Sequence, residues 1–204
     1  MKILIVYYSL YGHTLKLARA AEQGASQIEN AEVIFRRVRE FPETEVDMPN
    51  HPHADKVWQQ QKDTPECTLD DLKAADGIIF ASPTRFGNMI AQMKRLFDSC
   101  ASLWMEGALE GKPAGVLTST ASTHGGQETT LVSMMIPILH LGMVVVGCPY
   151  SIDGMIHTEA RGATPYGPTT LAGPDNSREP HEQDIEIAKQ YGKRFATITA
   201  KMTQ

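Results

Sequence analysis

The residues that follow the first strand-like segment of the chain could bind a phosphate. An apolar run stops at residues 9–14 (SLYGHT), where a helical pattern begins. At such a junction the free backbone N–H groups and the helix dipole point at one spot. Ser9, His13 and Thr14 add side-chain donors, and Gly12 lets the backbone approach a ligand closely. An ordinary βα connection with Ser9 or Thr14 as N-cap satisfies the same donors without a ligand, so this loop alone leaves both interpretations open.

The common nucleotide-binding signatures are missing from this junction. No Gly-x-Gly-x-x-Gly follows the first strand-like run, which argues against a dinucleotide fingerprint. The nearest approach to a P-loop, residues 107–113, has the wrong spacing and places Pro113 where the metal-binding hydroxyl belongs. The sequence therefore disfavours ATP and GTP chemistry.

Two further polar loops follow later strand-like runs. They are residues 82–88 (SPTRFGN) and residues 119–128 (STASTHGGQE). Because ligands of open α/β sheets bind at the carboxyl ends of the strands, we expect these loops and residues 9–14 to form one site. Their hydroxyl, glycine and amide groups suit a flat polar ring with a phosphate tail, and Phe86 offers an apolar wall.

The elements that position these loops follow from the hydrophobic pattern. Strand-like runs alternate with amphipathic helical patterns, which predicts a parallel sheet with helices on both faces. The predicted strands are residues 2–8, 33–38, 77–81, 114–118 and 143–146. Helical patterns run from Leu15 to Ile28, Met89 to Cys100, Leu131 to Leu139, and from near Pro180 onward. We expect a single domain over residues 1–204, with long loops at 40–66 and 147–179.

Composition excludes several classes of function. A net charge of -5 and a pI near 5.8 give no broad attraction to nucleic acid or anionic membranes. No apolar run reaches transmembrane length, so we expect no stable membrane insertion. The three cysteines are scattered, and His51 and His53 have no obvious third ligand, so we expect no metal or iron–sulfur site. Such thiols suit a reducing compartment, and we expect a cytoplasmic protein.

Four blocks of the sequence resemble the WrbA family of FMN-dependent NAD(P)H:quinone oxidoreductases. The blocks are residues 8–13 (YSLYGH), 83–89 (PTRFGNM), 125–128 (GGQE) and 162–167 (GATPYG). The similarity extends from the first strand to the last helix, and the second and fourth blocks are the specific ones. The resemblance implies a flavodoxin-like α/β fold. This is a doubly wound five-stranded parallel sheet in the order 2-1-3-4-5, with FMN at the switch between strands one and three.

The resemblance also implies roles for individual residues. The FMN phosphate would lie on residues 9–14, and the isoalloxazine ring against residues 84–86, with Arg85 supporting the reduced ring electrostatically. The expected cofactor-binding residues are Ser9, Leu10, Tyr11, Gly12, His13, Thr14, Thr84, Arg85, Phe86, Ser119, Thr120, Ala121, Ser122, Thr123, His124, Gly125 and His140. Tyr11 and Trp104 would contact substrate, and His140 would reach the site from a neighbouring subunit or from its helix end. Residue type alone favours a surface or core aromatic for Trp104 and a helix C-cap for His140, and the resemblance reverses this preference.

The activity that the resemblance implies is two-electron reduction of quinones by NADH or NADPH. Hydride would pass through flavin N5, with nicotinamide and quinone using one pocket in turn, and no dedicated catalytic acid or base is expected. The family also implies a homotetramer, whose interface we expect to include part of residues 147–179. Two other classes of function compete: a one-electron-carrier flavodoxin, and a flavin-bound regulatory or scaffold protein.

Overall fold

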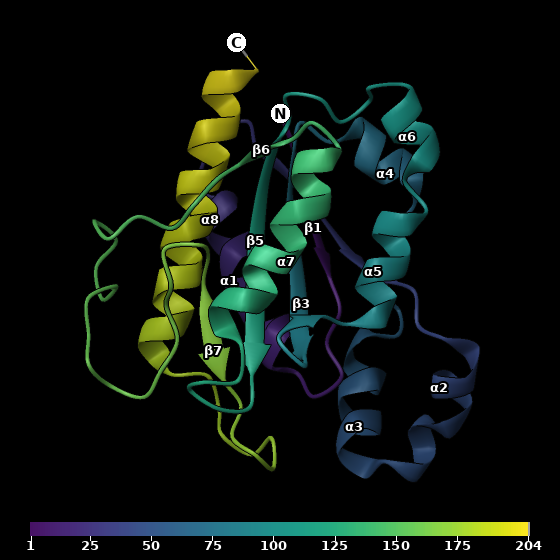
Figure 1. Cartoon of the computed structure of the whole chain (residues 1–204), viewed down its shortest axis with the longest axis vertical. Helices are drawn as coiled ribbons and strands as arrows, with labels where there is room; N and C mark the ends of the chain where they lie inside the picture. Colours follow the sequence, from purple (N-terminus) through teal and green to yellow (C-terminus); the bar gives the residue numbers. More distant parts are fainter. Residues whose placement is uncertain (204) are drawn as a thin grey trace.

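A twisted sheet runs through the centre of the molecule, with helices on both faces (Figure 1). The computed structural model describes residues 1–203. The main strands are β1 (Lys2–Tyr7), β2 (Glu32–Arg37), β3 (Gly77–Arg85), β5 (Pro113–Thr120) and β6 (Val144–Val145), in the order β2-β1-β3-β5-β6 with all pairs parallel. This is the predicted 2-1-3-4-5 order, so the flavodoxin-like fold class is confirmed.

The sheet has seven strands rather than the predicted five. β4 (Asn88–Met89) turns back antiparallel on the end of β3, and β7 (Thr169–Leu171) pairs in parallel with the end of β5. β6 pairs with the beginning of β5, so β6 and β7 share one edge of that strand. The chain between them makes the long excursion expected over residues 147–179, but it returns to the carboxyl end of the sheet.

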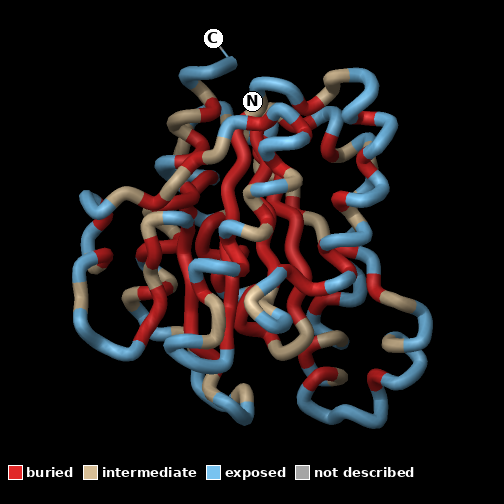
Figure 2. Tube along the Cα trace, in the orientation of Figure 1, coloured by how far each residue is buried: buried red, intermediate tan, exposed pale blue. Residues whose placement is uncertain are grey.

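Burial explains the composition of the central strands. Every residue of β5 and residues 3–7 of β1 are buried, because helices cover both faces of the sheet. Figure 2 shows this as a continuous buried centre. The edge strand β2 is only half-buried and carries two arginines.

The two faces are covered by different helices. α1 (His13–Ala25) and α8 (Glu182–Met202) cover one face. Each presents a glycine to the other, because a Cβ on Gly24 would lie 1.8 Å from the Lys189 carbonyl oxygen and one on Gly192 would lie 2.0 Å from that of Ala21. The other face is covered by α4 (Leu69–Ala74), α5 (Ala91–Asp98), α6 (Ala101–Met105) and α7 (Gln127–His140). The helix predicted to start at Met89 starts at Ala91, since Met89 belongs to β4. None of the helices in residues 1–203 combines the length and the apolarity needed to cross a membrane.

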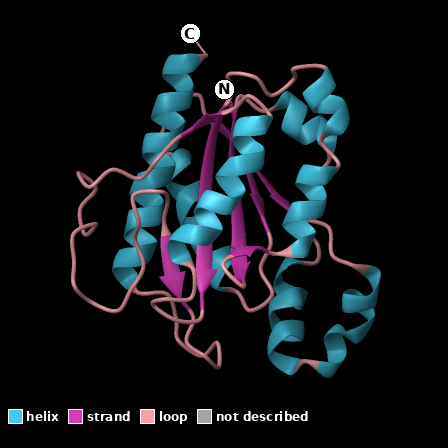
Figure 3. Ribbon diagram, viewed as in Figure 1, coloured by secondary structure: helices cyan, strands magenta, loops and turns pink. Residues whose placement is uncertain are grey.

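Residues 40–66 are largely helical, and the expected long loop is wrong. They contain α2 (Pro42–Asp47), the 3-10 helix η1 (Met48–Asn50) and α3 (Pro52–Gln61). Pro42 and Pro52 stand at the first positions of their helices, where a missing N–H costs nothing. Figure 3 shows α2 and α3 as a pair beneath α5, at the carboxyl end of the sheet. We call residues 42–61 the helical cap.

Candidate functional site

The three polar loops meet at the carboxyl edge of the sheet, as predicted. They enclose a cavity of about 100 Å³ with contributions from the loops after β1, β3 and β5 and from the segment after β7. Its lining residues are Ser9, Leu10, Tyr11, His13, Thr14, Pro83, Thr84, Arg85, Ser119, Thr120, Ala121, Ala172 and Asn176. The carboxyl edge at the point where strand order reverses is where open α/β sheets bind ligands.

The first loop has the geometry of a phosphate site. Gly12 precedes α1 with φ +92°, a left-handed conformation that favours glycine. No side chain in the described part of the chain caps this helix, and the Ser9 hydroxyl accepts instead from the Gly12 N–H at 3.1 Å. The N–H groups of the first turn of α1 are therefore available to an anion, and the residues present fit the phosphate of FMN.

The helical cap and the segment before α8 hold this phosphate loop in place. The Gln61 side-chain amide donates to the Ser9 carbonyl oxygen at 2.6 Å, and Val57 lies 3.5 Å from where a Cβ on Gly12 would be. His13 Nε2 lies 2.9 Å from the carbonyl oxygen of Arg178. Burial lowers the pKa of His13 below its ordinary value of 6.5, so its imidazole is neutral at pH 7.

The second loop presents Arg85 and Phe86 at a sharp turn. Thr130 of α7 donates its hydroxyl to that of Thr84 at 2.7 Å, which anchors the end of β3. Phe86 adopts φ +53°, an uncommon conformation for a bulky residue, and its side chain is fully exposed. A strained backbone and an exposed aromatic ring do not stabilise the fold. They are typical of loops that bind a ligand.

The third loop is tied to β7 through one buried glutamine. The side-chain amide of Gln127 donates to the Thr123 carbonyl oxygen at 3.1 Å, and its oxygen accepts from the Thr169 hydroxyl. That hydroxyl in turn accepts from the Ala163 N–H at 2.9 Å. The GGQE and GATPYG blocks, far apart in the sequence, are therefore parts of one hydrogen-bonded unit.

Two larger openings flank the central cavity. One has a volume of about 640 Å³ and lies between α2 and β4, lined by Arg85, Phe86 and Lys94 among others. The other, of about 500 Å³, lies between Tyr11 and the helical cap. The Tyr11 ring is tilted against His53 with centroids 5.7 Å apart. Together the openings offer room for substrates beside a ring bound in the central cavity.

A buried polar network forms the floor beneath the 640 Å³ opening. The Tyr8 hydroxyl donates to Glu40 at 2.5 Å, and the Gln92 side-chain amide donates to the same carboxylate at 2.5 Å. The Phe41 N–H donates to Glu40 at 2.9 Å. Burial, and then the Glu40 carboxylate, raises the pKa of Tyr8, which keeps its hydroxyl protonated. The network joins the residue after β1, the helix α5 and the segment that leads into the helical cap.

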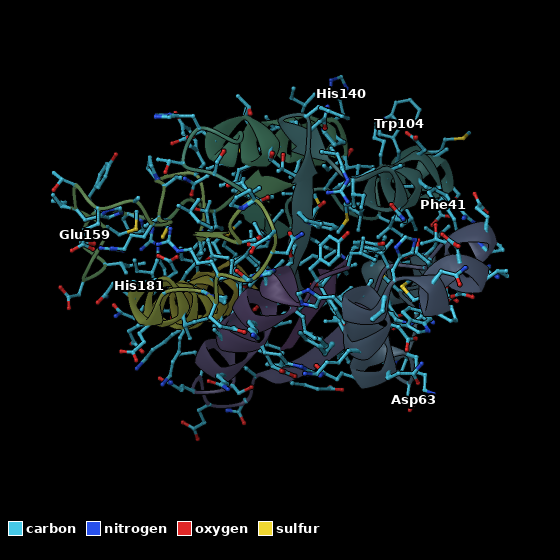
Figure 4. All side chains as sticks on the ribbon, turned by 90° about the horizontal axis from the view of Figure 1, so that it is seen from below. Phe41, Asp63, Trp104, His140, Glu159 and His181 are labelled. Carbon is cyan, nitrogen blue, oxygen red and sulfur yellow. The ribbon has the colours of Figure 1, made fainter. Side chains whose placement is uncertain are left out.

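The structure brings most of the expected residues together, with defined exceptions. Ser122, Thr123, His124 and Gly125 continue the third loop away from the cavity, where all but Gly125 are exposed. His140 ends α7 about 20 Å along the helix from its start near the cavity. Figure 4 shows His140 and Trp104 on the outer side of the α6 and α7 layer, pointing away from the sheet. Neither reaches the cavity within its own chain.

Several residues of the site were not predicted. Ala172 and Asn176 reach the cavity because β7 returns the chain to the carboxyl edge, and a three-residue strand gives little sequence signal. Gln61 lies in the stretch that was expected to be a loop. Gln127 was part of a recognised block, but its contact with Thr169 depends on the tertiary fold.

Comparisons with known proteins agree with this geometry. A family model described as NADPH-dependent FMN reductase matches residues 1–158. An NAD(P)H dehydrogenase (quinone) of Geotalea uraniireducens is 45% identical over 206 residues, covering 100% of both chains. One of Solidesulfovibrio magneticus is 45% identical over 203 residues, covering 99% of both.

Solved structures agree in fold. A WrbA-like flavodoxin of Agrobacterium tumefaciens has a TM-score of 0.69 at 23% identity, with 98% of each chain covered. An archaeal flavodoxin has a TM-score of 0.64 at 20% identity, with 98% of this chain and 99% of that chain covered. The resemblance read from the four sequence blocks is confirmed by the full-length relatives. The chain belongs to the NADPH-dependent FMN reductase family, together with these NAD(P)H dehydrogenase (quinone) relatives.

Proposed function

We propose that this chain is an FMN-dependent NAD(P)H dehydrogenase (quinone) that works as a single flavin-binding domain over residues 1–204. The observation that carries the proposal is the uncapped start of α1 at a cavity where the loops after β1, β3 and β5 meet. The full-length relatives with 45% identity bear the same activity in their names. When bound, FMN supplies a ring that accepts two electrons from a nicotinamide and passes them to a quinone.

The protein's part is to bind and orient the flavin. The phosphate would be held by residues 9–14, through the backbone N–H groups of the first turn of α1 and the Ser9 and Thr14 hydroxyls, while the His13 imidazole donates to the Arg178 carbonyl oxygen. The ring would be held by Thr84, Arg85 and Phe86 on one edge and by residues 119–121 on the other, while residues 122–125 continue away from the cavity. Arg85 is exposed, and its guanidinium donates to the Thr84 carbonyl oxygen at 3.2 Å, which keeps it beside the cavity. There its charge stabilises negative charge that develops on the ring.

Nicotinamide and quinone use the open side of the cavity in turn. Tyr11 lies on the wall between the central cavity and the 500 Å³ opening, and Phe86 at the rim of the 640 Å³ opening. These aromatic faces suit flat substrates. The described residues of the central cavity offer no paired carboxylates, which fits a reaction in which the cofactor carries the chemistry.

We further propose that the active protein is a cytoplasmic homotetramer. The outer face of α6 and α7 carries exposed apolar side chains, with exposed fractions from 40% to 80%: Trp104, Met105, Val132, Ile136 and Leu139. Scattered exposed apolar residues are ordinary, but five of them on two helices that cover the same face of the sheet suit an interface. His140 and Trp104 lie on this face, so association could bring them to the flavin of a neighbouring subunit.

The experiment that tests the activity is anaerobic. The FMN-loaded protein is mixed with NADH or NADPH while the flavin absorbance is recorded, and benzoquinone is then added. We expect complete two-electron bleaching followed by rapid recovery. If the bound flavin stays oxidised with both nicotinamides, a regulatory or scaffold protein is favoured. If the flavin is reduced by one electron and no further, a carrier flavodoxin is favoured.

A further inference from the structure

A further cavity lies beside α1, outside the flavin-binding site. It has a volume of about 540 Å³ and is bounded by α1, by the end of α3 and by the segment that leads into α8. Lys16 and Arg19 of α1, Thr64 and Tyr7 are among its lining residues. None of these four side chains has a part in the flavin site proposed above.

The Tyr7 hydroxyl is a buried polar group without a partner. Tyr7 is fully buried, and among residues 1–203 no hydrogen bond of normal geometry satisfies its hydroxyl, although the Thr64 side chain lies close enough to offset part of the rise that burial causes in the pKa of Tyr7. Its ring packs against Phe35 with centroids 4.6 Å apart, which fixes the side chain. Burial raises the pKa of Tyr7, so the hydroxyl stays protonated and can donate. Because buried polar groups are normally satisfied, this hydroxyl at the cavity wall points to a ligand that accepts a hydrogen bond.

The charges around the cavity favour an anion. Lys16, Arg19 and Glu179 together give the lining a net charge of +1. Lys16 pairs with Glu179, and Arg19 pairs with Glu22 at 2.8 Å, but both cations are nearly half exposed. Exposed ion pairs contribute little to the free energy of folding. A ligand anion can therefore replace the carboxylate partners at a small cost in free energy. The Arg19 guanidinium also lies 3.7 Å from the centre of the Phe35 ring, which orients it.

The remaining lining is apolar enough to contact the body of a small organic molecule. Leu15, Ala20, Pro180 and Ile185 provide aliphatic surface around the charged rim. The volume is in the range of small-molecule sites, which combine apolar walls with a few polar groups that fix orientation.

We propose that this cavity binds a small organic anion, an apolar body carrying one phosphate or carboxylate group. Lys16 and Arg19 bind the anionic group, the Tyr7 hydroxyl donates a hydrogen bond to a ligand oxygen, and the aliphatic walls contact the body. The cavity adjoins the phosphate loop, because Gln61 lines it and also donates to the Ser9 carbonyl oxygen. The inference does not depend on the quinone chemistry proposed above.

Calorimetric titration of the FMN-saturated protein tests the proposal. Phenyl phosphate and benzoate serve as probes, and phenol is the neutral comparison. We expect saturable one-to-one binding of at least one anion and much weaker binding of phenol. Tyr7→Phe and Arg19→Gln should each weaken anion binding by about tenfold, the loss expected for a hydrogen bond to a charged group. Lys193→Gln, which removes an exposed lysine of α8, is the matched control and should bind as the parent protein does.

Every outcome of these titrations either supports the anion site or overturns it. Tyr7→Phe keeps the buried ring and removes an unsatisfied hydroxyl, so we expect it to fold at least as stably as the parent protein. Binding of phenyl phosphate alone would identify a phosphate ligand, and binding of benzoate alone a carboxylate. The proposal would be overturned by no saturable binding of either anion, by equal binding of phenol, or by unchanged affinity in both cavity variants.

Discussion

A Cβ atom on Gly126 would lie only 2.7 Å from the Cα of Gly87, so the turn that carries Phe86 and the turn that starts α7 touch backbone to backbone. Gly126 also has φ +93°. We expect Gly126→Ala to lower the free energy of unfolding by about 2 to 3 kcal/mol, from backbone strain and from the clash. It should also weaken FMN binding, because the turn carrying Arg85 must shift. Chemical denaturation measures the free energy of unfolding, and FMN titration measures the dissociation constant.

Gly111 provides the matched control. It has φ +76°, but no atom lies within 4 Å of where its Cβ would be. Gly111→Ala therefore carries the backbone strain without the clash and should leave FMN binding unchanged. Equal effects of the two variants would show that the contact between the turns has no role.

The hydrogen bond from Gln61 to the Ser9 carbonyl oxygen is expected to support both the stability of the protein and its affinity for FMN. Gln61→Met keeps the length of the buried side chain but leaves that oxygen unsatisfied, which costs about 1 to 3 kcal/mol of stability. Because the phosphate loop loses its support, we expect the FMN dissociation constant to rise as well, measured by fluorescence titration. Gln60→Met, an exposed neighbour, should change neither quantity.

Arg85 is expected to act on the rate of flavin reduction. Its charge lies beside the proposed ring site, so Arg85→Ala should slow reduction by NADH by about tenfold, equivalent to about 1.4 kcal/mol, or weaken FMN binding. Arg85→Lys keeps the charge and should retain most of the rate. Rapid-mixing absorbance measures the rate, and unchanged rate and affinity in Arg85→Ala would refute the role.

His13 predicts a pH dependence of stability. Burial lowers the pKa of its imidazole in the folded protein below the ordinary 6.5. As the pH falls below 6.5, the unfolded chain takes up a proton here before the folded protein does, so the free energy of unfolding falls. Denaturation of the apoprotein at about pH 7 and about pH 5.5 should show this loss, and His13→Gln should lose less across the same interval. Equal losses would exclude His13 as the cause.

The apolar face of α6 and α7 predicts the state of association. Ile136→Glu combined with Leu139→Glu should reduce the molar mass measured by light scattering from that of a tetramer, because charges on a buried interface are costly. Val46→Glu places the same charge on α2, where the side chain is 82% exposed, and should leave the mass unchanged. A parent protein that is monomeric and fully active would contradict the proposed tetramer.

Much of the fold and most of the lining of the central cavity could be predicted from the sequence. Strands β1, β3 and β5 are long apolar runs, and the polar loops after them lie where strand order reverses, so the topology alone predicts that Ser9, Thr84 and Ser119 converge. The helical cap was not predicted, because its helices are short and its buried residues few: Met48, Ala54, Val57 and Gln61. Such helices depend on packing against the phosphate loop rather than on a strong periodic pattern.

The sequence by itself determined the strand-like runs, the polar loops that follow them and the family, because these depend on contiguous residues with fixed spacing. The sheet order followed from the resemblance to that family. Only the tertiary structure decided that β7 returns Asn176 to the cavity and that Gln127 joins two distant blocks. It also placed Trp104 and His140 away from their own chain's cavity. A contact between residues distant in sequence depends on the folded path of the chain, and no local periodicity encodes that path.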